Sequence, residues 1–285
     1  MPSIIRKILD LLLVIPVSLI PQRFLSSKVH SLAMLEQTGF KNFLIKTFHR
    51  IYKVDLSEAK KERVADYKSF AEFFTRELKP EARLIATDEN ALISPVDGTI
   101  SRAGMIKHDL LYQAKGHYYS LSDLITDDKL AENFINGHFI TIYLSPRDYH
   151  RVHMPTAGKL NRMLYVPGRL WPVNPPSVRQ VSSLFARNER AILEFNTDEG
   201  RMLLIMVGAL FVGSIETVFA GKLAPPYQNQ VKTYNYQNLE YSRGDEIGRF
   251  NLGSTVILLF EHESIKLTSQ EGKRLRMGES LNHII

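Results

Sequence analysis

Residues 250–260 read FNLGSTVILLF, a short polar step followed by an unbroken apolar run from Val256 to Phe260. An apolar run of this length, bounded by glycine and serine, is typical of a buried β-strand. A glycine before a strand usually serves backbone geometry, and a serine beside it usually serves a turn. Gly253-Ser254 therefore has an ordinary structural explanation, and the rest of the chain must decide whether it also has a chemical one.

On either side of this strand the chain shows two different patterns. Helical periodicity dominates to about residue 79, where Ser69 can cap a helix and Pro80 follows its end. From about residue 91, short apolar runs separated by turn residues are typical of strands in a mostly antiparallel sheet. These runs are HFITIYL, RAILEF, RMLLIMVGALFVG and STVILLF. We predict an α+β fold with a helical region over residues 1–80, followed by a β-rich, mostly antiparallel, sandwich-like candidate catalytic domain over residues 81–285.

The composition is that of a globular protein with an anionic partner. Of 285 residues, 44% are hydrophobic and 23% are charged, which excludes a disordered chain. The absence of cysteine excludes structural disulfides and thiolate metal sites, and it favours a reducing compartment. A net charge of +6 favours contact with nucleic acid or with anionic lipid, and does not choose between them.

The N-terminal segments favour lipid. The apolar run from Leu11 to Ile20 is shorter than the roughly 20 residues of a spanning helix, and Asp10 and Pro21 bound it. No small-residue cleavage site follows, as a signal peptide would need. Residues 40–53, FKNFLIKTFHRIYK, combine apolar residues at helical spacing with a basic remainder. This helix could face either the core or a membrane surface, and two adjacent segments of this kind favour peripheral association with an anionic membrane.

Three polar stretches lie within the β-rich part. SPVDGTI places Asp97 in a turn-like setting, and SPRDYHRVHMP holds His150 and His153. Two histidines at this spacing could bind a metal, but no third ligand is evident nearby. Asp, His and Ser are the components of an activated serine. Ser254 lies in L-G-S-T and not on a G-x-S-x-G elbow, so the obvious electrophile for its hydroxyl is the carbonyl of Gly253.

With these stretches in view, the chain resembles the phosphatidylserine decarboxylases of the pyruvoyl-dependent, self-processing, bacterial membrane-associated type. The resemblance extends from about residue 40 to residue 260. It is carried, in this order, by FAEFFTRELKP, SPVDGTI, QAKGHYYSL, YLSPRDYHRVHMP, LFARNER, VGALFVGSIET and GRFNLGST. The histidine stretch and L-G-S-T are together highly specific.

The resemblance implies a self-processing triad of Asp97, His153 and Ser254, with cleavage between Gly253 and Ser254. His153 would be the base and Asp97 its orienter. Residue 254 would become a covalent pyruvoyl group, the cofactor of the mature enzyme. The fragments 1–253 and 254–285 would stay together as a heterodimer, and its further dimerisation is left open.

The resemblance also implies the reaction. The pyruvoyl group would form a Schiff base with the amine of phosphatidylserine, and carbon dioxide would leave to give phosphatidylethanolamine. His150 is the candidate proton donor for that step. We expect no metal, no diffusible cofactor and no nucleic-acid partner, and we expect a peripheral protein on the cytoplasmic face of the cell membrane.

Two other interpretations make different predictions. A membrane-associated serine hydrolase would use Asp97, His153 and Ser254 on an external acyl substrate and would keep its chain intact. A lipid-binding module without enzyme activity would tolerate replacement of Ser254. Self-processing instead predicts two fragments.

Overall fold

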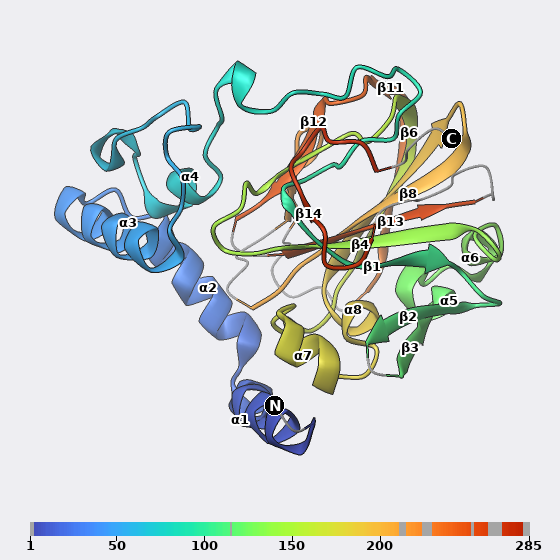
Figure 1. Ribbon diagram of the computed structural model, residues 1–285, viewed down its shortest axis with the longest axis horizontal. Helices are drawn as coiled ribbons and strands as arrows, with labels where there is room; N and C mark the ends of the chain where they lie inside the picture. The colour runs from blue at the N-terminus through green and yellow to red at the C-terminus, as the bar shows by residue number, and fades with distance from the viewer. Residues whose placement is uncertain are drawn as a thin grey trace.

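The computed structural model describes residues 3–114, 116–210, 215–223, 230–251, 254–261 and 270–281. Helices form the N-terminal part and flank a β-rich body (Figure 1). The helices are α1 Ser3–Leu19, α2 Gln22–Ala33, α3 Thr38–Tyr52, α4 Phe70–Phe74, α5 Leu121–Ile125, α6 Asp128–Glu132, α7 Pro175–Gln180 and α8 Leu184–Arg187, with 3₁₀ turns η1 Val64–Asp66 and η2 Pro80–Ala82.

The strands form three sheets, and the named strands pair antiparallel throughout the described ranges. The largest sheet has the order β11-β6-β7-β8-β13-β4-β1-β14, a second has the order β10-β9-β12-β5, and β2 pairs with β3. The strands are β1 Gly98–Met105, β2 Leu110–Ala114, β3 His117–Ser120, β4 His138–Leu144, β5 Arg151–His153, β6 Gly158–Val166, β7 Arg190–Thr197, β8 Gly200–Val207, β9 Ile215–Thr217, β10 Gly221–Lys222, β11 Lys232–Tyr241, β12 Glu246–Phe250, β13 Ser254–Phe260 and β14 Arg274–Leu275. The predicted α+β fold with a mostly antiparallel sheet is confirmed.

Strand β13 lies in the interior of the largest sheet, as its sequence predicts. It pairs with β4 on one side and with β8 on the other, and all seven of its residues are buried. A strand that is covered on both faces needs apolar side chains on both, which explains why VILLF does not alternate with polar residues. The other predicted runs are strands β4, β7 and β8, but β8 ends at Val207. Residues 208–210 of the last run are therefore not strand, and residues 211–213 lie outside the described part.

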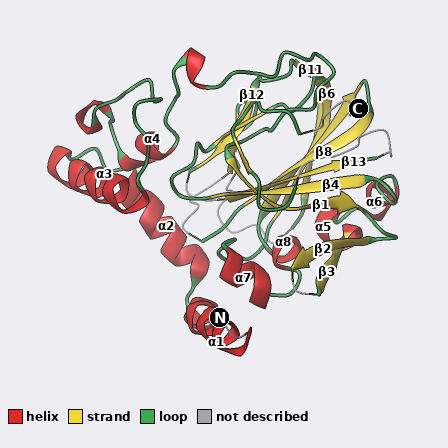
Figure 2. Cartoon of the chain, viewed as in Figure 1, coloured by secondary structure: helices red, strands yellow, loops and turns green. Residues whose placement is uncertain are grey.

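The two larger sheets meet at the segment that carries the predicted cleavage bond. Strand β12 belongs to the four-stranded sheet, and β13, which begins four residues after β12 ends, belongs to the eight-stranded one (Figure 2). Ile247 and Phe250 of β12 share one buried core with Val256 and Leu258 of β13. The chain therefore crosses from one sheet to the other between Phe250 and Ser254.

The N-terminal helices end earlier than the periodicity predicts. Ser69 does cap a helix, since its hydroxyl accepts a hydrogen bond from the Glu72 backbone at 3.2 Å, but α4 ends at Phe74. Pro80 begins the short η2 turn and does not directly follow a helix, so the prediction of helix to about residue 79 was too long. A helix cannot continue into Pro80 because residues before proline are pushed to extended conformations, and Lys79 is extended.

Helix α3 has both of the faces between which the sequence could not choose. Ile45 is buried and Phe48 packs against the same cluster, whereas Phe43 and Ile51 are each 65% exposed. Lys41, which the sequence places on the basic side, is buried instead. Its Nζ donates to the carbonyls of Ala65 at 3.2 Å and Tyr67 at 2.5 Å, so it is unavailable to an anionic surface.

Helix α1 is docked on the β-rich body through the acidic residue that interrupts its apolar run. The Asp10 carboxylate lies 2.7 and 2.8 Å from the Arg179 guanidinium of α7, which lies beside α1 in Figure 1. The side of α1 that faces away from the β-rich body exposes apolar residues such as Leu12 and Leu19. Within the described ranges no single helix has the length and hydropathy to cross a bilayer. Residues 7–19 and 22–33 reach that length and hydropathy only when taken together, and these two helices are bent by 87° relative to each other.

Candidate active site

Ser254 is the first residue of β13 and is completely buried. Its hydroxyl has no hydrogen-bond partner among the described residues, and neither does that of Thr255. A buried hydroxyl without a partner carries a desolvation cost, and such groups in a native fold call for an explanation. Gly253, the other half of the predicted cleavage site, lies outside the described residues.

The loop that bears the histidines begins beside Ser254. In the β13–β4 pairing Ser254 lies opposite Leu144, the last residue of β4, so the loop from Ser145 starts at the same end of the sheet. The Asp148 carboxylate accepts bonds of 2.7 Å from both the backbone and the hydroxyl of Ser145. The same carboxylate pairs with Arg274 at 3.0 Å. These contacts hold the loop in one conformation.

His150 lies at the end of this loop and is fully buried. Its ring stacks on Phe74 of α4 with 4.1 Å between centroids, and its carbonyl accepts from the backbone of Phe250 at 3.0 Å. That bond places it next to the crossover that leads to Ser254. Neither ring nitrogen makes a hydrogen bond of normal geometry within the described part of the chain, although the carbonyls of Pro146 and Ser145 face the ring.

Burial and charge keep His150 neutral. Desolvation, followed by the positive charge of Arg76, lowers its pKa to about 3. Arg76 is itself buried and donates to the carbonyls of Arg147 at 3.0 Å and Asp148 at 3.2 Å. Near neutral pH the His150 ring therefore carries one N–H and one lone pair, and can both donate and accept one hydrogen bond.

His153 ends β5, and both of its ring nitrogens are occupied. Nδ1 lies 2.8 Å from the carbonyl oxygen of Gly244, and Nε2 lies 3.0 Å from the hydroxyl of Tyr149. Burial lowers the pKa of His153, while the Gly244 carbonyl acts in the opposite direction. Gly244 has a φ of +91°, a left-handed conformation that favours glycine.

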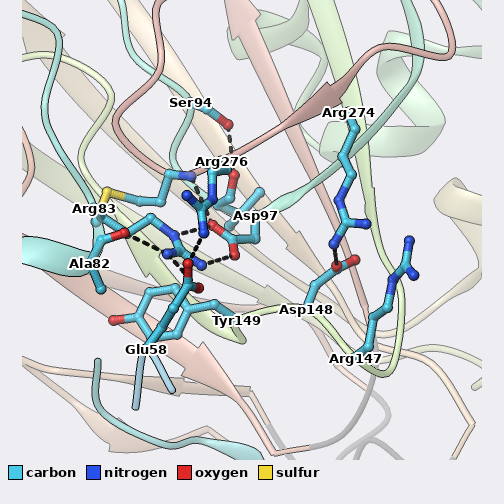
Figure 3. Close-up of polar contacts among 12 residues, drawn as sticks. Glu58, Ala82, Arg83, Ser94, Asp97, Arg147, Asp148, Tyr149, Arg274 and Arg276 are labelled. Atoms are coloured by element: carbon cyan, nitrogen blue, oxygen red, sulfur yellow. Dashed lines mark hydrogen bonds and ion pairs between the residues drawn. The ribbon is translucent and has the colours of Figure 1, made fainter. Parts of the chain in front are cut away.

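Asp97 is held by an arginine that the sequence alone did not single out. Arg83 Nε lies 2.8 Å from Asp97 Oδ1, its Nη2 pairs with Oδ2, and the backbone N–H of Met277 donates to Oδ1 at 2.9 Å (Figure 3). Glu58 joins Arg83 at 2.9 Å and also pairs with Arg276. Gly98 follows Asp97 because a Cβ there would lie 2.7 Å from the carbonyl oxygen of Tyr143.

The structure brings the predicted residues into one region without bonding their side chains to one another. The His153 backbone donates to the Pro95 carbonyl at 2.9 Å, which places His153 beside the Asp97 segment. Over the described ranges, however, no hydrogen bond joins Asp97 to His153 or His153 to Ser254. Nor does any group of three His, Cys, Asp or Glu residues suited to a metal occur there.

A cavity of about 480 Å³ opens beside His153 and Tyr149. Arg83 and Met277, the two partners of Asp97, also line it. The remaining lining residues are Lys60, Glu77, Leu78, Lys79, Pro80, Ile85 and Arg151. The cavity gives the histidine access to solvent, whereas Ser254 and His150 stay beneath the surface.

The residues that sequence reasoning missed are Arg83, Tyr149, Arg76 and Gly244. Tyr149 and Arg76 lie within stretches that carried the family resemblance, so their position was a usable signal. Arg83 and Gly244 lie in irregular segments, and only the folded chain places them against Asp97 and His153.

We expect Arg83→Gln to destabilise the chain by about 3 kcal/mol, because it leaves the nearly buried Asp97 carboxylate without its charged partner. The matched control is Arg276→Gln, which removes a half-exposed partner of Glu58 and should cost less than about 1 kcal/mol. Urea unfolding of both variants, made in the Ser254→Ala chain, measures the difference. Equal losses would show that the Arg83–Asp97 pair contributes no more than a surface contact.

Comparisons with known proteins agree over nearly the whole chain. The family model for phosphatidylserine decarboxylase matches residues 70–283, and a second model, described as PSD, matches residues 12–53. Curated relatives bear the name phosphatidylserine decarboxylase proenzyme. One from Alkalilimnicola ehrlichii is 52% identical over 84% of this chain and 85% of its own length. One from Dechloromonas aromatica is 46% identical over 95% of this chain and 98% of its own. The chain therefore belongs to the phosphatidylserine decarboxylase family, and it is an enzyme of the decarboxylase class.

Proposed function

We propose that this protein converts phosphatidylserine to phosphatidylethanolamine and carbon dioxide, using a pyruvoyl group that it makes from Ser254 by self-cleavage after Gly253. One observation carries the proposal: a fully buried serine hydroxyl without a described partner begins the central strand, beside the loop that holds His150. The name proenzyme, which the relatives bear, is consistent with such processing.

The cleavage needs a nucleophile, a base and an unhindered carbonyl. The Ser254 hydroxyl attacks the Gly253 carbonyl and replaces the amide with an ester, while His153 accepts the proton. Elimination then removes the Cα proton of residue 254, breaks the bond between its Cβ and the ester oxygen, and releases the Gly253 carboxylate. The resulting enamine takes up a proton at Cβ and becomes an imine. Water finally replaces the amine nitrogen of residue 254, which leaves as ammonia. Asp97 contributes its negative charge near His153, which favours the protonated ring.

The fold supports a stable pair of fragments. The small fragment, residues 254–285, begins with β13, whose apolar side chains each contribute ~1.5–3 kcal/mol through burial between β4 and β8. Its later part pairs along residues 92–98, since Leu275 lies opposite Gly98 and the Leu281 backbone donates to the Leu92 carbonyl at 2.8 Å. Cleavage before β13 breaks none of these contacts, so we infer a heterodimer of fragments 1–253 and 254–285.

In the mature enzyme, the pyruvoyl group at position 254 supplies the electron-withdrawing carbonyl that such decarboxylations require. The chain's own residues contribute a buried site of defined shape. His150 lies on the loop beside residue 254 and is neutral, so its ring N–H can pass a proton to the substrate carbon after carbon dioxide leaves as the other ring nitrogen takes up a proton in exchange. Phe74 fixes the plane of that ring through stacking.

We further propose that the protein works on the cytoplasmic face of the cell membrane, with anionic lipid as a partner. The support is the apolar surface of α1 and α2, where Leu12, Leu19 and Phe24 are each more than 60% exposed. The Asp10–Arg179 pair fixes α1 to the β-rich body, so lipid that contacts α1 lies at a fixed position relative to the site.

We expect the double change Leu12→Ser and Leu19→Ser to weaken binding to phosphatidylserine-containing vesicles at least tenfold, because two large side chains lose ~1.5–3 kcal/mol each of burial in lipid. Co-sedimentation measures this binding. Leu84→Ser is the matched control, since Leu84 is 81% exposed but lies outside the N-terminal helices. Loss of binding in the control alone, or in neither protein, would contradict the assignment of this surface.

A decarboxylation assay tests the proposed function directly. Vesicles that carry phosphatidylserine labelled at the serine carboxyl should release labelled carbon dioxide with the wild-type protein and none with Ser254→Ala. A serine hydrolase would instead release fatty acid or head group from the same vesicles and leave the label in the lipid or serine. Release of fatty acid without carbon dioxide would favour the hydrolase interpretation.

A further inference from the structure

The hydrogen bonds around His153 define which of its nitrogens can act as a base. A backbone carbonyl only accepts hydrogen bonds, so the 2.8 Å contact with Gly244 requires a proton on Nδ1. The ring is neutral near pH 7, since burial lowers its pKa. Nε2 therefore carries the lone pair, and the Tyr149 hydroxyl, 3.0 Å away, donates to it.

Tyr149 is built to remain a donor. Its side chain is buried, and burial raises the pKa of its hydroxyl, so the phenol keeps its proton throughout the neutral range. The Tyr149 and His153 rings also contact each other, with 5.6 Å between centroids and 29° between planes.

The Gly244 side of the ring is equally well supported. The Gly244 backbone N–H donates to the Met154 carbonyl at 2.9 Å, and the Met154 N–H donates to the Asp245 carbonyl at 2.8 Å. The turn is closed by a 2.7 Å bond from the Ser242 backbone to the Asp245 carboxylate. The Gly244 carbonyl, which accepts the hydrogen bond from Nδ1–H, is thus held in place by Met154, the residue next to His153.

We propose that Tyr149 is a positioning residue for His153. Its hydrogen bond holds the ring so that Nε2 keeps its lone pair and is the nitrogen that accepts the serine proton in the proposed self-cleavage. The role of Tyr149 in self-cleavage rests on the proposed function, whereas the hydrogen bonds around His153 do not depend on it. A proton that reaches Nε2 must arrive through the Tyr149 hydroxyl or after that hydroxyl has turned aside. The Tyr149 hydroxyl can donate to Nε2 only while that nitrogen keeps its lone pair, so the bond stabilises the neutral ring.

The charged surroundings of His153 bear on any pH dependence. Glu246 of β12 lies opposite His153 in the strand pairing, and Asp97 lies on the neighbouring segment; both favour the protonated ring. Arg151 of β5 opposes it. Lys60, Glu77, Lys79 and Arg83 line the cavity that His153 shares. Because Tyr149→Phe alters none of these charges, a change in titration reports the lost hydrogen bond.

The first test uses the full-length Ser254→Ala chain with ¹⁵N-labelled histidine, and His153→Gln assigns the signal. Long-range ¹H–¹⁵N correlation spectra should show the Nδ1–H tautomer for His153. Tyr149→Phe removes a bond that stabilises the neutral ring, so the titration midpoint should rise by roughly half to one pH unit. Tyr143→Phe, which removes a β4 hydroxyl that is not a partner of His153, should leave the midpoint in place. The Nε2–H tautomer, or an unchanged midpoint in Tyr149→Phe, would overturn the proposal.

The second test follows maturation of cell-free synthesised chains with Ser254 intact, as the appearance of two fragments across a pH series. In Tyr149→Phe the pH of half-maximal rate should rise by the same amount as the titration midpoint. An unchanged pH profile would contradict the positioning role of Tyr149 even if the rate of cleavage fell. A wild-type chain that stayed intact at every pH would contradict the proposed function instead, and the spectra would still decide whether Tyr149 holds the ring.

Discussion

The Ser254→Ala chain is expected to remain whole, while the wild-type protein separates into a large fragment of residues 1–253 and a small one of residues 254–285. Alanine has no hydroxyl to attack the preceding carbonyl, so the variant lacks the nucleophile that the cleavage requires. Because the side chain at 254 is fully buried and its hydroxyl has no described partner, the variant should fold normally. Intact-mass spectrometry should give one species for the variant and two for the wild type, with a small fragment that lacks a free amine.

Thr255→Ala is the matched control. Thr255 is the next residue of β13, equally buried, and its hydroxyl also lacks a partner among the residues described. Removal of this hydroxyl should leave cleavage intact, because Thr255 is one residue further along the chain from the predicted cleavage bond. If both variants stayed whole, the loss would reflect disturbed packing of the strand. A wild-type small fragment with a free serine amine would exclude a pyruvoyl group.

The two histidines are expected to separate by function. His153→Ala should block maturation, because the buried ring that accepts the serine proton is gone, and an intact chain on a denaturing gel would show it. His150→Ala should still mature but lose at least a hundredfold in decarboxylation, since general acid catalysis typically contributes 10²–10⁴-fold. Carbon dioxide release by the processed His150 variant measures the second effect.

A second substitution guards against a packing artefact at position 150. His150→Ala opens a cavity against Phe74, whereas His150→Gln fills much of it and keeps a polar group. Both should be processed and both should be poor decarboxylases. If the His150 variants stayed unprocessed while His153→Ala matured, the two roles would be reversed.

Features of the fold that depend on local patterns were mostly predictable from the sequence. The continuous apolar run of residues 256–260 predicted a buried strand, and β13 is a strand whose residues are all buried. The N-cap at Ser69 and the strands β4 and β7 are likewise explained by short-range rules. Only the family resemblance led us to expect that residues 94–97 and 145–153 lie close together, because no local rule relates segments so far apart in the sequence.

Partnerships between distant groups were not predictable in this way. Lys41 was expected on a basic surface, yet its ammonium group is buried against the carbonyls of Ala65 and Tyr67. Asp97 was expected to orient His153, a role that remains a prediction, and in the structure it bonds to Arg83 and Met277. In each case the partners lie outside the longer helices and the strands, in a 3₁₀ turn or in an irregular segment whose path no periodicity describes.

The sequence by itself therefore determined the antiparallel β-rich architecture, the strand that begins at Ser254 and the chemical types of the candidate residues. The tertiary structure alone decided which nitrogen of His153 is basic, because that depends on Gly244, 91 residues away. It alone decided that His150 is neutral, through complete burial beside Arg76. The physical reason is the same for both: residue type and local spacing specify which groups a chain carries, whereas desolvation and hydrogen bonding depend on which distant segments surround them.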